Sequence, residues 1–190
     1  MQKRELVEGY FISPVIKGGW QLSTGHSLTE SLENNSAVAD TISFIEAGIT
    51  TLDFGDIYTG VEEIIGQAVA HLTEKYGEAG RSKLKLHTKY VPNEASLANF
   101  DKADIEKIVD RSRQRLRVEQ VDLVQFHWWR YESQQYLEAM EELFRLKSLG
   151  KIRHVGVTNF DIVRLQEMVN SGFKPVSIRF FCIIRKFSTF

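Results

Sequence analysis

Short apolar runs alternate with longer stretches whose apolar residues recur at helical spacing. The apolar runs predict strands over 14–22, 50–52, 84–88, 122–126, 152–157 and from 175 to 178 and beyond, and residues 10–12 form either a short strand or an edge piece. The amphipathic stretches predict helices over 37–47, 62–72, 102–116, 134–149 and 161–171. Val38, Ile42, Phe44 and Ile45 should share one face of the first of these, and Asp101 should cap the third. Such alternation is typical of an α/β fold with a parallel sheet and right-handed crossovers.

The alternation by itself does not separate a doubly wound sheet from a closed (β/α)8 barrel. No Gly-x-Gly-x-x-Gly follows the first predicted strand, which weakens the dinucleotide-binding doubly wound alternative. A chain of 190 residues is the size of one ordinary domain, and no linker or low-complexity segment divides it. We therefore expect a single domain over residues 1–190.

Composition excludes several classes of function. The net charge of −1 gives no sign of a nucleic-acid partner, and no apolar run approaches the roughly 20 residues that span a bilayer. The N-terminal residues lack the apolar centre of a signal peptide, and a lone cysteine, Cys182, allows no internal disulfide. We therefore expect a cytoplasmic protein without a membrane partner. Five scattered histidines show no ligand spacing, so no metal site is expected.

Ionisable residues follow three successive predicted strands. Asp53 and Tyr58 follow the second strand, Lys89 the third and His127 the fourth. If these strands are parallel neighbours, the four side chains emerge at one end of the sheet, where parallel α/β folds place their chemistry. A tyrosine can protonate a carbonyl, and a nearby Lys89 ammonium would lower its pKa toward working pH. Asp53 would supply the counter-charge, and His127 would donate a hydrogen bond to the carbonyl oxygen or orient the substrate.

Each of these residues also has a purely structural interpretation. Asp53 can cap a helix, Tyr58 can be a half-buried core tyrosine, Lys89 can be solvated, and His127 can be a hydrogen-bonded core histidine. For each residue taken alone, the structural interpretation is at least as well supported as the catalytic one. The joint occurrence of the four residues at successive strand ends favours a catalytic site.

Five motifs in the chain resemble the signatures of the aldo-keto reductases. They are Leu-Asp-Phe-Gly-Asp-Ile-Tyr at 52–58, Glu-Glu-Ile-Ile-Gly at 62–66, His-Thr-Lys-Tyr at 87–90, Val-Asp-Leu-Val-Gln-Phe-His-Trp at 121–128 and Gly-Lys-Ile-Arg-His-Val-Gly-Val-Thr-Asn-Phe at 150–160. The resemblance implies a parallel (β/α)8 barrel that uses NADPH to reduce aldehydes or ketones, with a small-molecule carbonyl compound as substrate. It implies that Tyr58 is the general acid, that Lys89 and Asp53 tune it, and that His127 positions the carbonyl.

The resemblance also implies residues that bind the cofactor, and aromatic residues near the strand ends are candidates for a substrate cleft. Thr158 and Asn159 would hold the nicotinamide carboxamide of the cofactor; alternatively, one of them caps the following helix. Trp20 and Trp128 would wall an apolar substrate cleft, with Trp128 the best placed because it follows His127 directly. Plain core packing is the alternative for these aromatic residues, and it is the stronger reading for Trp129.

The resemblance ends after residues 175–178. The family carries a Gln at the next position, whose amide helps hold the nicotinamide, whereas this chain has Arg179 and then a divergent tail over 179–190. A complete barrel takes roughly 250 residues, so we expect an incomplete barrel of about five to six βα units. The family's last two units, which grip the adenosine 2′-phosphate and pyrophosphate, have no counterpart here. We therefore expect impaired cofactor binding, and self-association through open sheet edges. The alternatives to an active enzyme are a non-catalytic half-barrel interaction protein or an inactive truncated isoform.

Overall fold

The computed structural model describes residues 2–23, 34–132 and 135–179. The strands are β1 Arg4–Val7, β2 Tyr10–Ile12, β3 Ile16–Gly18, β4 Thr51–Asp53, β5 Lys85–Tyr90, β6 Val121–Phe126, β7 Ile152–Thr158 and β8 Ile178–Arg179. The α-helices are α1 Asn34–Glu46, α2 Val61–Arg81, α3 Lys102–Leu116, α4 Gln135–Ser148 and α5 Ile162–Asn170. Two short 3₁₀ helices cover Trp20–Leu22 and Glu94–Asn99.

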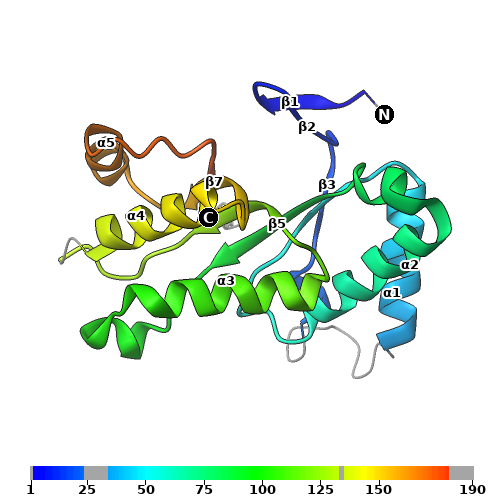
Figure 1. Ribbon diagram of the computed structural model, residues 1–190, viewed down its shortest axis with the longest axis horizontal. Helices are drawn as coiled ribbons and strands as arrows, with labels where there is room; N and C mark the ends of the chain where they lie inside the picture. Colours follow the sequence, from blue (N-terminus) through cyan, green and yellow to red (C-terminus); the bar gives the residue numbers. More distant parts are fainter. Residues whose placement is uncertain (1, 24–33, 133–134, 180–190) are drawn as a thin grey trace, which may run out of the picture.

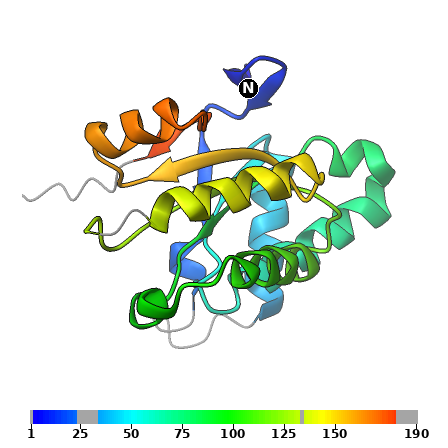
Figure 2. The ribbon, with the colours of Figure 1, turned by 60° about the vertical axis from the view of Figure 1, so that its left-hand side comes forward.

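Strands β3 to β8 form a six-stranded parallel sheet in chain order, as the alternation predicted. Helices α1 to α4 pack side by side in sequence order, and they cover one face of the curled sheet (Figures 1 and 2). The chain thus forms an incomplete (β/α)8 barrel, and the fold prediction is confirmed. Because all six strands run the same way, their carboxyl ends meet at one end of the sheet.

The core fills the space between the sheet and its helices. Leu86, Val124 and Val155 contribute from three neighbouring strands, and Leu143 and Leu146 contribute from α4; all are at most 1% exposed. The burial of such side chains stabilises the domain by about 2 kcal/mol each. Asp101 caps α3 as predicted, since its carboxylate accepts a hydrogen bond from the backbone N–H of Ala103.

Several predicted elements differ in length from those observed. The first strand is shorter than predicted, because the chain turns into the 3₁₀ helix at Trp20. Helix α2 continues to Arg81 across a kink at Gly77, whose φ of 63° lies in the left-handed region. The sixth strand starts only at Ile178, and its predicted continuation lies outside the described residues. Phe44 was expected on the buried face of α1, yet it is 43% exposed and lies under the Lys17 ammonium, 4.7 Å from its ring centroid.

An antiparallel hairpin of β1 and β2 lies at the other end of the sheet from the carboxyl ends of the strands (Figure 2). Tyr10, on β2, is fully buried, and its hydroxyl is 2.9 Å from Nε2 of His87 on β5. Burial lowers the pKa of His87 to about 4, so its ring is neutral at physiological pH. The hairpin therefore covers one end of the sheet and leaves the carboxyl ends of the strands for a site.

Candidate active site

A cavity of about 320 Å³ lies at the carboxyl ends of the strands. Its lining residues come from β3, β4, β5, β7 and β8 and the loops that follow β3 and β4: Gly18, Gly19, Trp20, Gln21, Asp53, Tyr58, Lys89, Thr158 and Arg179. The parallel register places Gly18 beside Asp53 and Thr158 beside Arg179. Residues far apart in the sequence are thereby brought together, including three of the four predicted catalytic residues.

A buried ion pair forms the floor of this cavity. The Lys89 ammonium lies 2.7 Å from Oδ1 of Asp53 and 2.6 Å from the carbonyl oxygen of Phe54. Gln125 donates a hydrogen bond of 2.6 Å to Oδ2 of the same carboxylate. Burial would raise the pKa of Asp53, but the Lys89 ammonium and these hydrogen bonds outweigh it and hold that pKa below its ordinary value. Asp53 is therefore a fixed negative charge, and the helix-capping interpretation of this residue is wrong.

Tyr58 is half-buried, and its ring faces the Lys89 ammonium at 5.4 Å from the ring centroid. Its pKa is raised, chiefly because burial disfavours the phenolate and also because Asp53 is close. This corrects the expectation that Lys89 lowers the pKa of Tyr58. The ammonium is directed at the Asp53 carboxylate, whose negative charge offsets much of the field that Lys89 exerts on the phenol.

His127 lies just beyond the end of β6 and is not among the residues that line the cavity. Its Nδ1 is 3.5 Å from the carbonyl oxygen of Thr158, and burial lowers its pKa, so the ring is neutral. A carbonyl oxygen only accepts, so Nδ1 carries the proton in this contact and Nε2 accepts hydrogen bonds. Both predicted roles of His127 stay predictions.

Thr158 ends β7 and is buried at the cavity wall, and Asn159 follows it in the left-handed region with a φ of 62°. The alternative interpretation of these residues as helix caps is wrong. Asp161 caps α5 instead, because its carboxylate accepts a hydrogen bond from the backbone N–H of Arg164. A role of Thr158 and Asn159 in cofactor binding stays a prediction.

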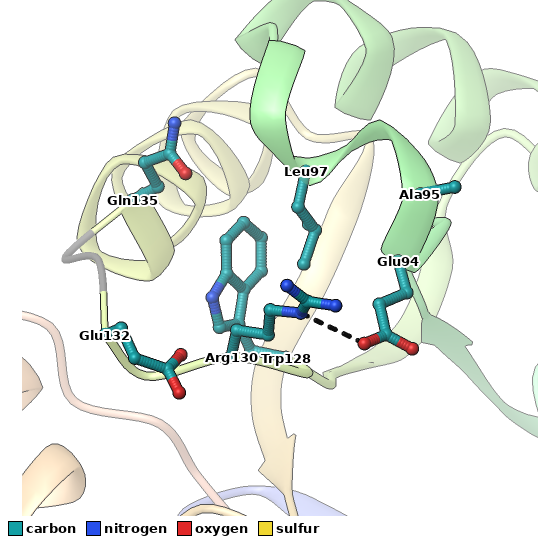
Figure 3. Close-up of a pocket in the computed structure, with 7 residues that line it drawn as sticks. All are labelled: Glu94, Ala95, Leu97, Trp128, Arg130, Glu132 and Gln135. Carbon is teal, nitrogen blue, oxygen red and sulfur yellow. Dashed lines mark hydrogen bonds and ion pairs between the residues drawn. The ribbon is translucent and has the colours of Figure 1, made fainter.

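The two tryptophans predicted at the substrate cleft lie in different places. Trp20 lines the cavity and is 44% exposed. Trp128 is 1% exposed, packs against Phe126 and Phe100, and lines a separate cavity of about 580 Å³. In that cavity its ring lies beside Leu97, and the ion pair of Arg130 and Glu94 lies on the same side of the ring as Leu97 (Figure 3). The prediction that Trp128 lies beside the catalytic residues is therefore wrong.

Two residues that contact the Asp53 carboxylate, Gln125 and Arg179, were not among the predicted site residues. Gln125 was assigned to an apolar strand, although a buried amide amid apolar residues signals a polar partner inside the fold. Arg179 was noted only as a departure from the family pattern. Its Nη1 forms an ion pair with Oδ2 of Asp53, so the carboxylate is shared between two cations.

A second acidic group, Asp56, is buried within the loop that carries Tyr58. Oδ1 of Asp56 accepts a hydrogen bond from the backbone N–H of Val91, and Oδ2 is 3.8 Å from Arg111. The neighbouring Glu62 is fully buried and accepts a hydrogen bond from Thr88. Burial, followed by the negative charge of Glu62, raises the pKa of Asp56 to about 7.

The raised pKa makes the stability contribution of Asp56 depend on pH. Between about 4 and about 7 the folded chain retains a proton on Asp56 that the unfolded chain has released. The contribution is therefore full below the unfolded pKa and is lost as the pH rises through about 7. Relative to Asp56→Asn, which keeps an acceptor for Val91, we expect the wild-type free energy of unfolding to fall by a few kcal/mol across this range.

Urea denaturation of both proteins at several pH values measures this difference. His87, with its lowered pKa, acts in the opposite direction, but it is present in both proteins and cancels in the comparison. Parallel stability profiles for wild type and Asp56→Asn would contradict the prediction.

The curled parallel sheet with its covering helices is part of a (β/α)8 barrel domain. The Lys89–Asp53 ion pair and Tyr58 lie at the carboxyl ends of its strands. The sequence model of the aldo/keto reductase family matches residues 14–181, and the chain belongs to this family. The described residues contain no helix with the length and apolarity that a membrane span requires.

Individual relatives agree with this assignment. Methylglyoxal reductase DkgA of Yersinia pestis is 30% identical over 172 residues, covering 90% of this chain and 54% of that protein. The uncharacterized oxidoreductase YcsN of Bacillus subtilis is 33% identical over 171 residues, covering 84% and 53% respectively. An aldo-keto reductase of Bombyx mori, solved in complex with NADP, superposes with a TM-score of 0.78 at 21% identity, covering 95% of this chain and 58% of that one. The chain thus spans about half the length of the curated relatives it matches.

Proposed function

We propose that this chain carries the proton-transfer centre of an NADPH-dependent reductase that converts small aldehydes or ketones to alcohols. One observation carries the proposal. The Lys89 ammonium is held between Asp53 and the carbonyl oxygen of Phe54 and faces the ring of Tyr58 in a cavity. Lysines are rarely buried unless they are paired, and a buried pair beside a tyrosine at the carboxyl end of a parallel sheet is suited to acid catalysis.

In the proposed reaction Tyr58 donates its proton to the carbonyl oxygen of the substrate. Its raised pKa keeps the hydroxyl protonated in the resting site, as a general acid requires. As the proton leaves, negative charge develops on the phenol oxygen, and the nearby Lys89 ammonium stabilises it. The Asp53 carboxylate holds that ammonium in place, and the hydrogen bond from Gln125 fixes the position of the carboxylate.

A nicotinamide cofactor, when bound, supplies the hydride for this reaction. The residues at the cavity fit the nicotinamide end of such a cofactor. Thr158 offers a hydroxyl at the cavity wall, Asn159 carries an amide on the next residue, and a Cβ added at Gly18 would meet nothing within 4 Å, so the backbone there leaves room. We therefore assign the carboxamide to Thr158 and Asn159.

Binding of NADPH to the purified chain tests the proposal before any assay of turnover. We expect NADPH to quench tryptophan fluorescence, because Trp20 lines the cavity. A dissociation constant in the micromolar range, which corresponds to about −8 kcal/mol, would support the proposal. Thr158→Val, which keeps the shape of the side chain and removes its hydroxyl, should weaken binding about tenfold. Absence of binding at millimolar NADPH would reject the proposal for this chain.

A second candidate function, self-association as a non-catalytic scaffold, is favoured by the edges of the sheet. In the described ranges, β3 and β8 each pair with a single neighbour in that sheet. Ile16 and Ile178 on these strands are 40% and 38% exposed, and Ile162 on α5 is 82% exposed. Unpaired strands flanked by apolar side chains favour pairing with a second copy. Sedimentation velocity at rising protein concentration tests this, and a monomer at every concentration rejects it.

A further inference from the structure

The charges that line the catalytic cavity do not balance. Three of its lining residues are charged, namely Asp53, Lys89 and Arg179. One carboxylate is therefore shared by two cations, which bind its two oxygens from different strands. The lining thus carries one positive charge in excess, and positive clefts concentrate anions.

Arg179 is the cation that remains available to a ligand. Lys89 is mostly buried and is also bound by the carbonyl oxygen of Phe54, whereas the Arg179 side chain is 49% exposed at the cavity wall. Its ion pair with Asp53 engages Nη1. A guanidinium has five donors in a planar fork, so the other donors can pair with a second carboxylate.

We propose that the cavity selects carbonyl compounds that carry a carboxylate, that is, small oxo acids, and that Arg179 binds their carboxylate while Tyr58 faces their carbonyl. Both cations contact the same carboxylate of Asp53, and Lys89 also faces the ring of Tyr58, so the anion site and the proton donor are close together. This spacing suits acids whose carbonyl and carboxylate are near neighbours. The cavity volume of about 320 Å³ also suits a small ligand.

The proposal rests on the proposed reductase function for its chemistry, but not for binding. Reduction converts the oxo acid to a hydroxy acid: NADPH supplies a hydride to the carbonyl carbon and becomes NADP⁺, and Tyr58 supplies the proton to the oxygen. The binding step needs no cofactor and is measured without it. Binding of an oxo acid without NADPH binding would reject only the reductase, and reduction without a preference for acids would reject only this inference.

Pyruvate and methyl pyruvate form a matched pair of probes, because the ester keeps the carbonyl and removes the charge. Titration of the wild-type chain, followed by ligand-observed NMR of the probes' methyl signals, should show pyruvate binding at least tenfold more tightly than the ester. The preference should weaken at high salt. Equal affinity for the two probes, or no binding of pyruvate at millimolar concentration, would overturn the proposal.

Variants then assign the preference to one residue. Arg179→Gln removes the charge and should abolish the preference for pyruvate, whereas Arg179→Lys should retain part of it. Arg130→Gln is the matched control, since Arg130 also pairs with one carboxylate but lies at the separate cavity shown in Figure 3. Thermal unfolding of each variant identifies any loss of folding. A folded Arg179→Gln that still prefers pyruvate would refute the role of Arg179.

Discussion

Tyr58→Phe is expected to lower the rate of NADPH-dependent carbonyl reduction by roughly 10²- to 10⁴-fold. The substitution removes only the hydroxyl of a tyrosine that lines the cavity, so the shape of the ring and its contact with the Lys89 ammonium are retained. Without the phenol, the developing alkoxide loses its proposed proton donor. The loss should fall on kcat rather than on KM, because proton transfer is made in the transition state.

The measurement is the oxidation of NADPH at 340 nm with an aromatic aldehyde as substrate. Tyr76→Phe serves as the control, because Tyr76 is exposed on α2 and its hydroxyl bonds only to the surface residue Glu46 among the contacts identified. Its rate should match that of the wild type. Equal rates for wild type and Tyr58→Phe would show that Tyr58 is not the acid, and unchanged NADPH binding in the variant would confirm that the loss is chemical.

Gly66→Ala is expected to destabilise the chain by about 3 kcal/mol or more, since overpacked sites rarely relax when backbone is the obstacle. A Cβ at Gly66 on α2 would lie 1.9 Å from the backbone carbonyl oxygen of Arg115 at the end of α3. Backbone atoms cannot rotate away as a side chain does, so the two helices must separate. Glu62, one turn earlier on α2, is fully buried beside Asp56, so the separation should also disturb the loop that carries Tyr58.

Thermal and urea unfolding followed by circular dichroism measure this effect. Gly18→Ala is the matched control, because a Cβ there meets nothing within 4 Å and its backbone is outside the left-handed region. Its stability should stay within about 0.5 kcal/mol of wild type. Equal stability of the two variants would show that α2 and α3 do not pack as closely as the geometry indicates.

Trp20 and Trp128 were predicted at one cleft but line two different cavities. Trp20 and Trp128 were both placed at the cleft because they lie near predicted strand ends, and Trp128 directly follows His127. Successive residues of a strand point to opposite faces of the sheet, so an error of one residue in the predicted position moves a side chain to the other face. Trp128 is therefore core, whereas Gln125, three residues earlier, supports Asp53 inside the sheet.

The sequence alone determined the order of strands and helices, the parallel sheet, the cap at Asp101 and the end of the sheet that carries the ionisable residues. These follow from periodicity and from the direction of parallel strands, both of which are local or topological properties. The family followed from the motifs. Burial and the pairing of charges were decided only by the tertiary structure. It paired the Lys89 ammonium with Asp53, buried Asp56 beside Glu62, and brought Arg179 from the far end of the chain onto the same carboxylate. Electrostatic shifts depend on which groups share a low-dielectric space, and the chain settles that only when it folds.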